Sequence, residues 1–202
     1  ASKSPKLLGT FSKGHLPFSI DRGHDAAIAA RVPSLVEMTQ AALGRFLASD
    51  KPFLLQVEGA RIDHAAHLND IGALLGDQIA FDDAVAAVLT MTAKHDDILV
   101  VVTSDHGNSN PGLNGMGDGY KESNQHFQNI ARFKASHERV LGEWNAKTNG
   151  DAGTISALVT EHLGFDLKKS EAEALIAILH KENVVEWNHQ LEKPEGLLGQ
   201  FA

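Results

Sequence analysis

Three short runs of apolar residues in the first half of the chain predict β-strands. They are KLLGTF at 6–11, PFLLQV at 52–57 and ILVVVTSDHG at 98–107. The third run is the clearest, because four of its first five residues are β-branched and such residues favour strands. Continuous apolar runs of this kind are typical of strands that are covered on both faces of a parallel sheet.

Between these runs, apolar residues recur at spacings of three and four, which predicts helices. PSLVEMTQAALGRFLAS predicts one amphipathic helix, with Pro33 at its first position. A longer helix is predicted over 63–94, and we expect Gly72 or Gly76 to break or bend it. Strands that alternate with helices predict an α/β fold, a mostly parallel sheet flanked by helices.

The pattern changes after His106. A loop rich in glycine and asparagine comes first, and no later run predicts a strand. Helical periodicity follows at about 122–144, 151–163 and 170–183. We therefore expect two regions, a partial α/β core at 1–106 and a glycine-rich loop with a mainly helical insertion or subdomain at 107–202.

Two of the later helices carry capping signals. Asp151 is a suitable N-cap, and Ser170 with Glu173 fits a capping box. The last residues, PEGLLGQFA, predict no closing element.

Composition narrows the classes of function. The 202 residues are 43% apolar and 22% charged, as in ordinary soluble globular proteins. Eighteen basic and 26 acidic residues give a net charge of −8, which argues against a nucleic-acid partner. No apolar run is long enough to cross a bilayer, so no membrane partner is expected. With no cysteine, any metal must be held by carboxylates and by the 11 histidines.

Residues with metal-binding chemistry follow two of the predicted strands. Glu58 comes directly after the run at 52–57, and Asp105 and His106 end the run at 98–107. Asp63 and His67 are four residues apart and would share one face of a helix.

The carboxyl ends of parallel strands lie at one edge of a sheet, so we expect these five side chains to approach one another. Carboxylates and imidazoles without thiols suit zinc or manganese, with magnesium at an all-oxygen position. Two adjacent metal ions would suit phosphoryl or sulfuryl transfer.

Each of these residues also has a structural explanation when taken alone. An Asp-His pair before a glycine can end a strand in a turn, and Asp63 can be a helix cap. His67 can be a partly buried histidine, and Glu58 an exposed loop acid. Their joint appearance at the ends of two predicted strands favours the metal site.

Two motifs resemble those of the alkaline phosphatase family. In that family V-E-G-x-R-I-D-H-x-x-H precedes a long helix and a strand that ends in T-x-D-H. The corresponding residues here are VEGARIDHAAH at 57–67 and TSDH at 103–106. LLGTF, HLPFSIDR and PSLVEMTQAAL are similar to the preceding segments, in the same order. The resemblance covers about 6–107.

The resemblance implies a metal-dependent phosphomonoesterase with two zinc ions and one magnesium ion. Glu58 would ligate magnesium. Asp63 and His67 would bind the first zinc, and Asp105 and His106 the second. His64 would lie near the phosphate and act through water, or else be a supporting or solvent-facing residue of the helix.

Other parts of the family pattern have no match in this chain. These are the serine or threonine nucleophile, the Asp-x-Thr magnesium segment and the arginine that clamps the phosphate. Ser104 lies at a position that the family does not use for attack, and Arg61 is a weak substitute for the clamp. The third ligand of the first zinc is not identified among the later histidines, His126, His137, His162, His180 and His189. We therefore expect a middle-to-C-terminal fragment that lacks the nucleophile and is inactive alone.

Two alternatives stay open. One is another hydrolase of the wider superfamily, such as a phosphodiesterase or a sulfatase, or a related mutase. The other is a non-catalytic metal-binding domain. The resemblance itself implies a phosphate monoester substrate, a possible homodimer and a periplasmic or extracellular location.

Overall fold

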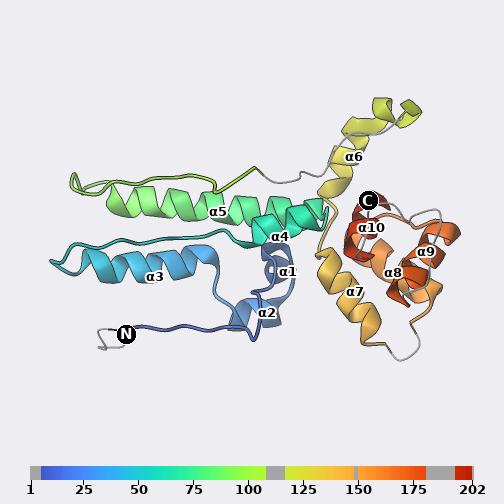
Figure 1. Cartoon of the computed structure of the whole chain (residues 1–202), viewed down its shortest axis with the longest axis horizontal. Helices are drawn as coiled ribbons and strands as arrows, with labels where there is room; N and C mark the ends of the chain where they lie inside the picture. Colours follow the sequence, from blue (N-terminus) through green and yellow to red (C-terminus); the bar gives the residue numbers. More distant parts are fainter. Residues whose placement is uncertain (1–5, 108–116, 148–149, 181–193, 202) are drawn as a thin grey trace.

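The computed structural model describes residues 6–107, 117–147, 150–180 and 194–201 (Figure 1). The first half contains two short helices and three further ones that build its framework. They are α1 (Ser19–His24), α2 (Ala26–Arg31), α3 (Leu35–Leu47), α4 (Arg61–His67) and α5 (Ile71–Thr92). In Figure 1, α3 and α5 lie side by side, and α1 and α4 pack at one end of α5. The sequence pattern did not predict α1 and α2.

The start of α3 is fixed by a reciprocal capping box. The Ser34 hydroxyl accepts the Glu37 N–H at 3.1 Å, and the Glu37 carboxylate accepts the Ser34 N–H at 2.7 Å. The helix therefore begins at Leu35, and Pro33 precedes the cap instead of opening the helix.

The single helix predicted over 63–94 is two helices, α4 and α5. Asn69 lies between them with a φ of 53°, a left-handed conformation that asparagine tolerates. Asp70 then caps α5 by accepting the Ala73 N–H at 3.0 Å. The break therefore comes from Asn69 and Asp70, and neither Gly72 nor Gly76 causes it.

The predicted parallel sheet is wrong, because the described residues form no β-strand. The segments at 52–57 and 98–107 run as extended chain beside α3 and α5 (Figure 1), and residues 6–11 are an exposed extended segment. In the described part of the chain, residues 52–57 and 98–102 form no backbone hydrogen bonds with one another or with other segments. Apolar, β-branched sequence favours an extended backbone, but a strand also needs a paired neighbour.

The described residues from 117 onward form mainly helices. Their elements are the 3₁₀ helix η1 (Gly117–Glu122) and the α-helices α6 (Ser123–Ile130), α7 (His137–Asn145), α8 (Ala152–Leu163), α9 (Lys169–Leu179) and α10 (Pro194–Phe201). Asp151 caps α8 by accepting the Thr154 N–H at 2.8 Å, which confirms its predicted role.

Three other predictions for this half need correction. The helix predicted over 122–144 is interrupted after Ile130, and Ser136 caps a new helix, α7. The capping box at Ser170 is wrong, because α9 begins at Lys169 and Glu171 accepts the Lys168 N–H at 2.8 Å. The chain also has a final helix, α10, which the sequence pattern did not predict.

The main hydrophobic core lies among α7–α10, which gather at one end of the molecule (Figure 1). Ile71 from α5 joins this core, so the helical half packs onto the first half. Its fully buried members include Val140, Ile155, Val159, Leu163, Leu175, Leu197 and Leu198.

Two buried carboxylates fasten the start of α7 to the first half. Asp21 accepts both the N–H and the hydroxyl of Ser136, each at 2.7 Å. Asp70 accepts the His137 N–H at 2.6 Å while it also caps α5. Both carboxylates are therefore satisfied by donors in spite of their burial. The division at residue 106 stays a prediction.

In the segments that the structure describes, no helix combines the length and the apolar character needed for a membrane span.

Candidate functional site

The motif at 57–67 lies where the extended segment at 52–57 turns into α4. Glu58 is exposed at this turn. A β-carbon on Gly59 would lie 3.0 Å from side-chain atoms of Ile62 in α4 and Phe81 in α5, so the turn lies close to both helices. The motif is thus held at the N-terminus of α4 by packing.

Asp63 and His67 lie one helical turn apart on α4, on a shared face as predicted. The Asp63 Oδ1 and His67 Nε2 atoms are 3.6 Å apart. Their side chains are 41% and 59% exposed, so both are accessible to a ligand from solvent.

Asp105 and His106 form a second pair at the end of the extended segment at 98–107. The Asp105 Oδ2 and His106 Nε2 atoms are 3.3 Å apart, and both side chains are exposed. The Ser104 hydroxyl donates to the His106 carbonyl at 2.7 Å. The three residues therefore also make the local turn that their sequence allows.

Each pair offers one carboxylate oxygen and one imidazole nitrogen, a donor set that suits zinc. Protein zinc sites use three or four protein ligands, however. Across the described ranges, no group of three or more histidine, aspartate or glutamate side chains is placed to hold one metal ion. Glu58 therefore does not form a three-residue group with either aspartate–histidine pair. The five ligand assignments stay predictions.

The Arg61 side chain contacts His64 within the motif and two residues outside it, Glu138 and Phe18. Its Nη2 donates to Glu138 of α7 at 2.7 Å, and its Nη1 lies 3.0 Å from His64 Nδ1. Its guanidinium lies 3.6 Å from the ring centre of Phe18, at cation–π distance. Arg61 therefore braces α4 against α7 and is not poised as a phosphate clamp.

The contact with Arg61 fixes the protonation of His64. A guanidinium only donates, so the Nδ1 atom of His64 must accept and the ring proton is on Nε2. Burial, Arg61 and the His15 ring, 4.4 Å away, lower the pKa of His64 below its ordinary value. His64 is therefore a neutral imidazole with one N–H to donate.

Sequence patterns did not single out His15 or Glu138. Glu138 is 77 residues from Arg61 in the chain, and no local spacing links the two. Of the later histidines, His137 is fully buried beside Asp70 and His162 bonds Glu143 at 3.0 Å. His180 lies against Trp144. The His126 side chain and all of His189 lie outside the described residues.

Comparison with known proteins decides the family. The family model described as alkaline phosphatase matches residues 1–163. The chain belongs to the alkaline phosphatase family. It is 35% identical over 123 residues to alkaline phosphatase 3 of Bacillus subtilis, which covers 60% of this chain and 25% of that protein. It is 45% identical over 87 residues to the streptomycin-6-phosphate phosphatase of Streptomyces griseus, covering 40% of this chain and 19% of that protein.

A solved alkaline phosphatase shares the arrangement of this chain. The crystal structure of Thermus thermophilus alkaline phosphatase is 36% identical and superimposes with a TM-score of 0.86. The match covers 98% of this chain and 41% of that one. The chain thus spans a quarter of the Bacillus enzyme and about two fifths of the Thermus enzyme.

Proposed function

We propose that this protein acts in the hydrolysis of phosphate monoesters. The observation that carries the proposal is the pair of family motifs, each of which ends in an accessible aspartate–histidine pair. The matched family model and relatives named as phosphatases support it. None of the relatives described above is named as a phosphodiesterase or a sulfatase.

We further propose that the two pairs are ligands of two zinc ions. Asp63 and His67 would hold one ion, Asp105 and His106 the other, and Glu58 would bind magnesium. When bound, zinc would stabilise negative charge on the oxygens of the reacting phosphate and activate water. Within each pair the carboxylate and imidazole already lie 3.3–3.6 Å apart, so little rearrangement is needed for both to reach one ion.

His64 is proposed to orient the phosphate. Its Nε2–H can donate to a phosphate oxygen, directly or through water, and a neutral ring does so without adding charge. The Arg61 contact at Nδ1 keeps the proton on Nε2, and the His15 ring limits rotation of the imidazole. These two residues are positioning residues in this proposal.

The chain by itself is expected to bind metal with little turnover. Its family motifs include no nucleophile, and the Ser104 hydroxyl is bound to the backbone of His106. The homodimer and the periplasmic or extracellular location stay predictions.

The test is zinc binding by calorimetry together with turnover of p-nitrophenyl phosphate. We expect Asp63→Asn and Asp105→Asn each to weaken zinc binding by roughly tenfold or more, because each removes a charged ligand. Asp82→Asn, an exposed residue on α5, is the matched control and should bind zinc like the wild type. Zinc binding that both motif variants leave unchanged would refute the metal proposal. Binding without turnover is the expected result for the wild-type chain.

A further inference from the structure

Each of the four residues 136–139 at the start of α7 contacts a charged side chain of the first half. The pairs are Ser136 with Asp21, His137 with Asp70, Glu138 with Arg61, and Arg139 with Asp25. Asp21 and Asp70 are buried, so the first two contacts already fix the start of α7 on the first half. Glu138 is therefore held in place whether or not it bonds Arg61.

The Glu138–Arg61 pair differs from these buried contacts in its exposure. The Glu138 side chain is 57% exposed and that of Arg61 is 11% exposed. An ion pair with one partner open to solvent contributes little to stability, because water and salt screen it. Since the docking of α7 does not depend on this pair, its main effect is on the orientation of Arg61.

The orientation of the Arg61 guanidinium depends on its two terminal nitrogens. Its Nε is buried, and no described residue accepts a hydrogen bond from it. The Phe18 ring attracts the face of the group but does not fix its rotation. The directional contacts are those of Nη2 with Glu138 at 2.7 Å and of Nη1 with His64 at 3.0 Å. The carboxylate is the stronger acceptor, because both partners of that bond are charged.

We propose that Glu138 is a positioning residue of the candidate phosphate site and acts on His64 through Arg61. The inference rests on the proposed role of His64 in orienting the phosphate. Without the carboxylate, the long Arg61 side chain regains rotamers that turn Nη1 away from the imidazole. The Nδ1 atom of His64 then loses its donor, and its Nε2–H is no longer held in one direction. The helical half of the chain thus takes part in phosphate binding through one side chain of α7.

The ring nitrogens of His64 report this contact directly. The full 202-residue chain is labelled with ¹⁵N-histidine and studied by NMR in mildly alkaline solution, where imidazole is neutral. Arg61→Met removes the donor and defines the full shift of the Nδ1 resonance. Glu138→Ala should produce most of that shift. Glu138→Gln, which keeps an acceptor oxygen without the charge, should produce a smaller one.

A double variant separates an effect through Arg61 from a general loosening of the structure. Arg61→Met combined with Glu138→Ala should shift the His64 resonance no further than Arg61→Met alone, because the two residues act in series. Zinc binding by Glu138→Ala should equal that of the wild type, because Glu138 is not a proposed ligand. A general disturbance of α4 would instead weaken zinc binding, since α4 carries Asp63 and His67.

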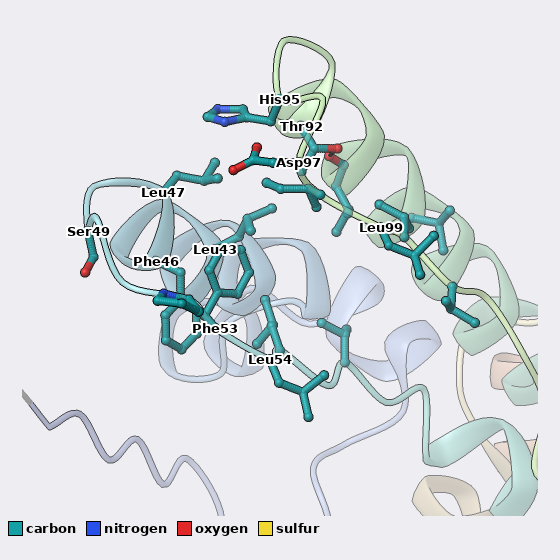
Figure 2. A pocket seen from close by; sticks show the side chains of 18 of the residues that line it. Leu43, Phe46, Leu47, Ser49, Phe53, Leu54, Thr92, His95, Asp97 and Leu99 are labelled. Atoms are coloured by element: carbon teal, nitrogen blue, oxygen red, sulfur yellow. Dashed lines mark hydrogen bonds between the residues drawn. The ribbon is translucent and has the colours of Figure 1, made fainter.

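The chain offers two controls. Glu161 is an exposed glutamate of α8, and Glu161→Ala should leave the His64 signals unchanged. His95 is an internal control, because it lines the groove between 52–57 and 98–102 that Figure 2 shows, beyond the C-terminal end of α5. The 22 residues of α5 span about 33 Å and separate His95 from α4, so its signals should not change in any variant.

Inorganic phosphate tests the consequence for the site. Calorimetric titration of the zinc-loaded chain gives its affinity for phosphate. Glu138→Ala should weaken this affinity by roughly threefold or more. In a His64→Gln background the same substitution should have no further effect, because the residue on which Glu138 acts is then absent.

Three results would overturn the proposal. The His64 nitrogens could keep their wild-type positions in Glu138→Ala, or the effects of Arg61→Met and Glu138→Ala could add. The third is a wild-type chain that binds phosphate and a Glu138→Ala variant that binds it equally well. A wild-type chain that binds no phosphate would instead refute the proposed role of His64, and the ring signals would still decide whether Glu138 positions that residue.

Discussion

Among the residues that the structure describes, the most deeply buried carboxylates are not those of the family motifs. Asp21 and Asp70 are 5% and 0% exposed, whereas Asp63 and Asp105 are open to solvent. Asp21 and Asp70 accept backbone N–H groups and hold the start of α7. Burial therefore separates two uses of aspartate, structural anchoring inside the molecule and the proposed ligand binding outside.

The pH dependence of stability should reveal Asp21. Desolvation raises its pKa above the ordinary value of 3.8, despite the hydrogen bonds from Ser136 and the charge of Arg139. The folded state then holds this proton more tightly than the unfolded state does. The contribution of Asp21 to the free energy of unfolding should therefore increase as pH falls toward 3.8.

The measurement is the melting temperature of wild type and Asp21→Asn between neutral pH and about pH 4. The wild type should gain stability relative to the variant as the solution becomes more acidic. Parallel profiles would mean that Asp21 titrates normally in the folded protein.

Replacing the carboxylate of Asp70 by an amide should destabilise the protein much more than the same change in an exposed helix N-cap. Asp70→Asn places an NH₂ group against one of two buried N–H donors, and should cost about 1–3 kcal/mol of unfolding free energy. Asp151→Asn is the control, because asparagine caps helices as well as aspartate does, and it should change little. Chemical denaturation measures both. Equal losses would contradict the anchoring role of Asp70.

At the scale of residues, the sequence identified the motif residues but not the residues that pack against them. Asp63 and His67 could be paired from their spacing, because four residues make one helical turn. The contacts of Arg61 with Phe18 and Glu138 could not, because tertiary packing brings them together from distant parts of the chain.

At the scale of elements, local sequence signals predicted the helices better than they predicted the conformation of the extended segments. Asp151 and the apolar periodicity act within a few residues, so α8 was predictable. The predicted strands depended on neighbours that periodicity does not supply, and the described chain leaves 52–57 and 98–102 unpaired. The break after α4 was placed wrongly because the glycines that suggested it serve in packing.

Gly72 shows that packing role. A β-carbon there would lie 2.5 Å from the Phe133 ring, which is itself buried in the main core. Gly72→Ala should therefore destabilise the protein by about 1–3 kcal/mol, in spite of alanine's better helix propensity. The melting temperature would fall accordingly.

Gly142 of α7 is the matched control. It is also helical, but a β-carbon there would meet nothing within 4 Å. Gly142→Ala should stabilise the protein by up to about 1 kcal/mol. A stabilising Gly72→Ala would show that the Phe133 contact can relax without cost.

At the scale of the whole molecule, burial and backbone hydrogen bonding differ strongly between regions. Ile155, Val159 and Leu163 of α8 are fully buried, whereas the residues at 98–102 are largely exposed and unpaired. In the chain alone, amide hydrogens of α8 should exchange far more slowly than those of 99–102. Hydrogen exchange followed by mass spectrometry tests this. Comparable protection in both places would indicate pairing of the extended segments in solution.

The double role of Asp70 bears on where the polypeptide can be divided. Its carboxylate joins the first turn of α5 to a backbone N–H 67 residues further along the chain. A shorter protein that stops near residue 107 would retain this carboxylate but lose one of its two donors, together with the core that covers Ile71. The boundary suggested by the change in sequence pattern is therefore a poor place to cut, and a truncation there should yield an insoluble or protease-sensitive product.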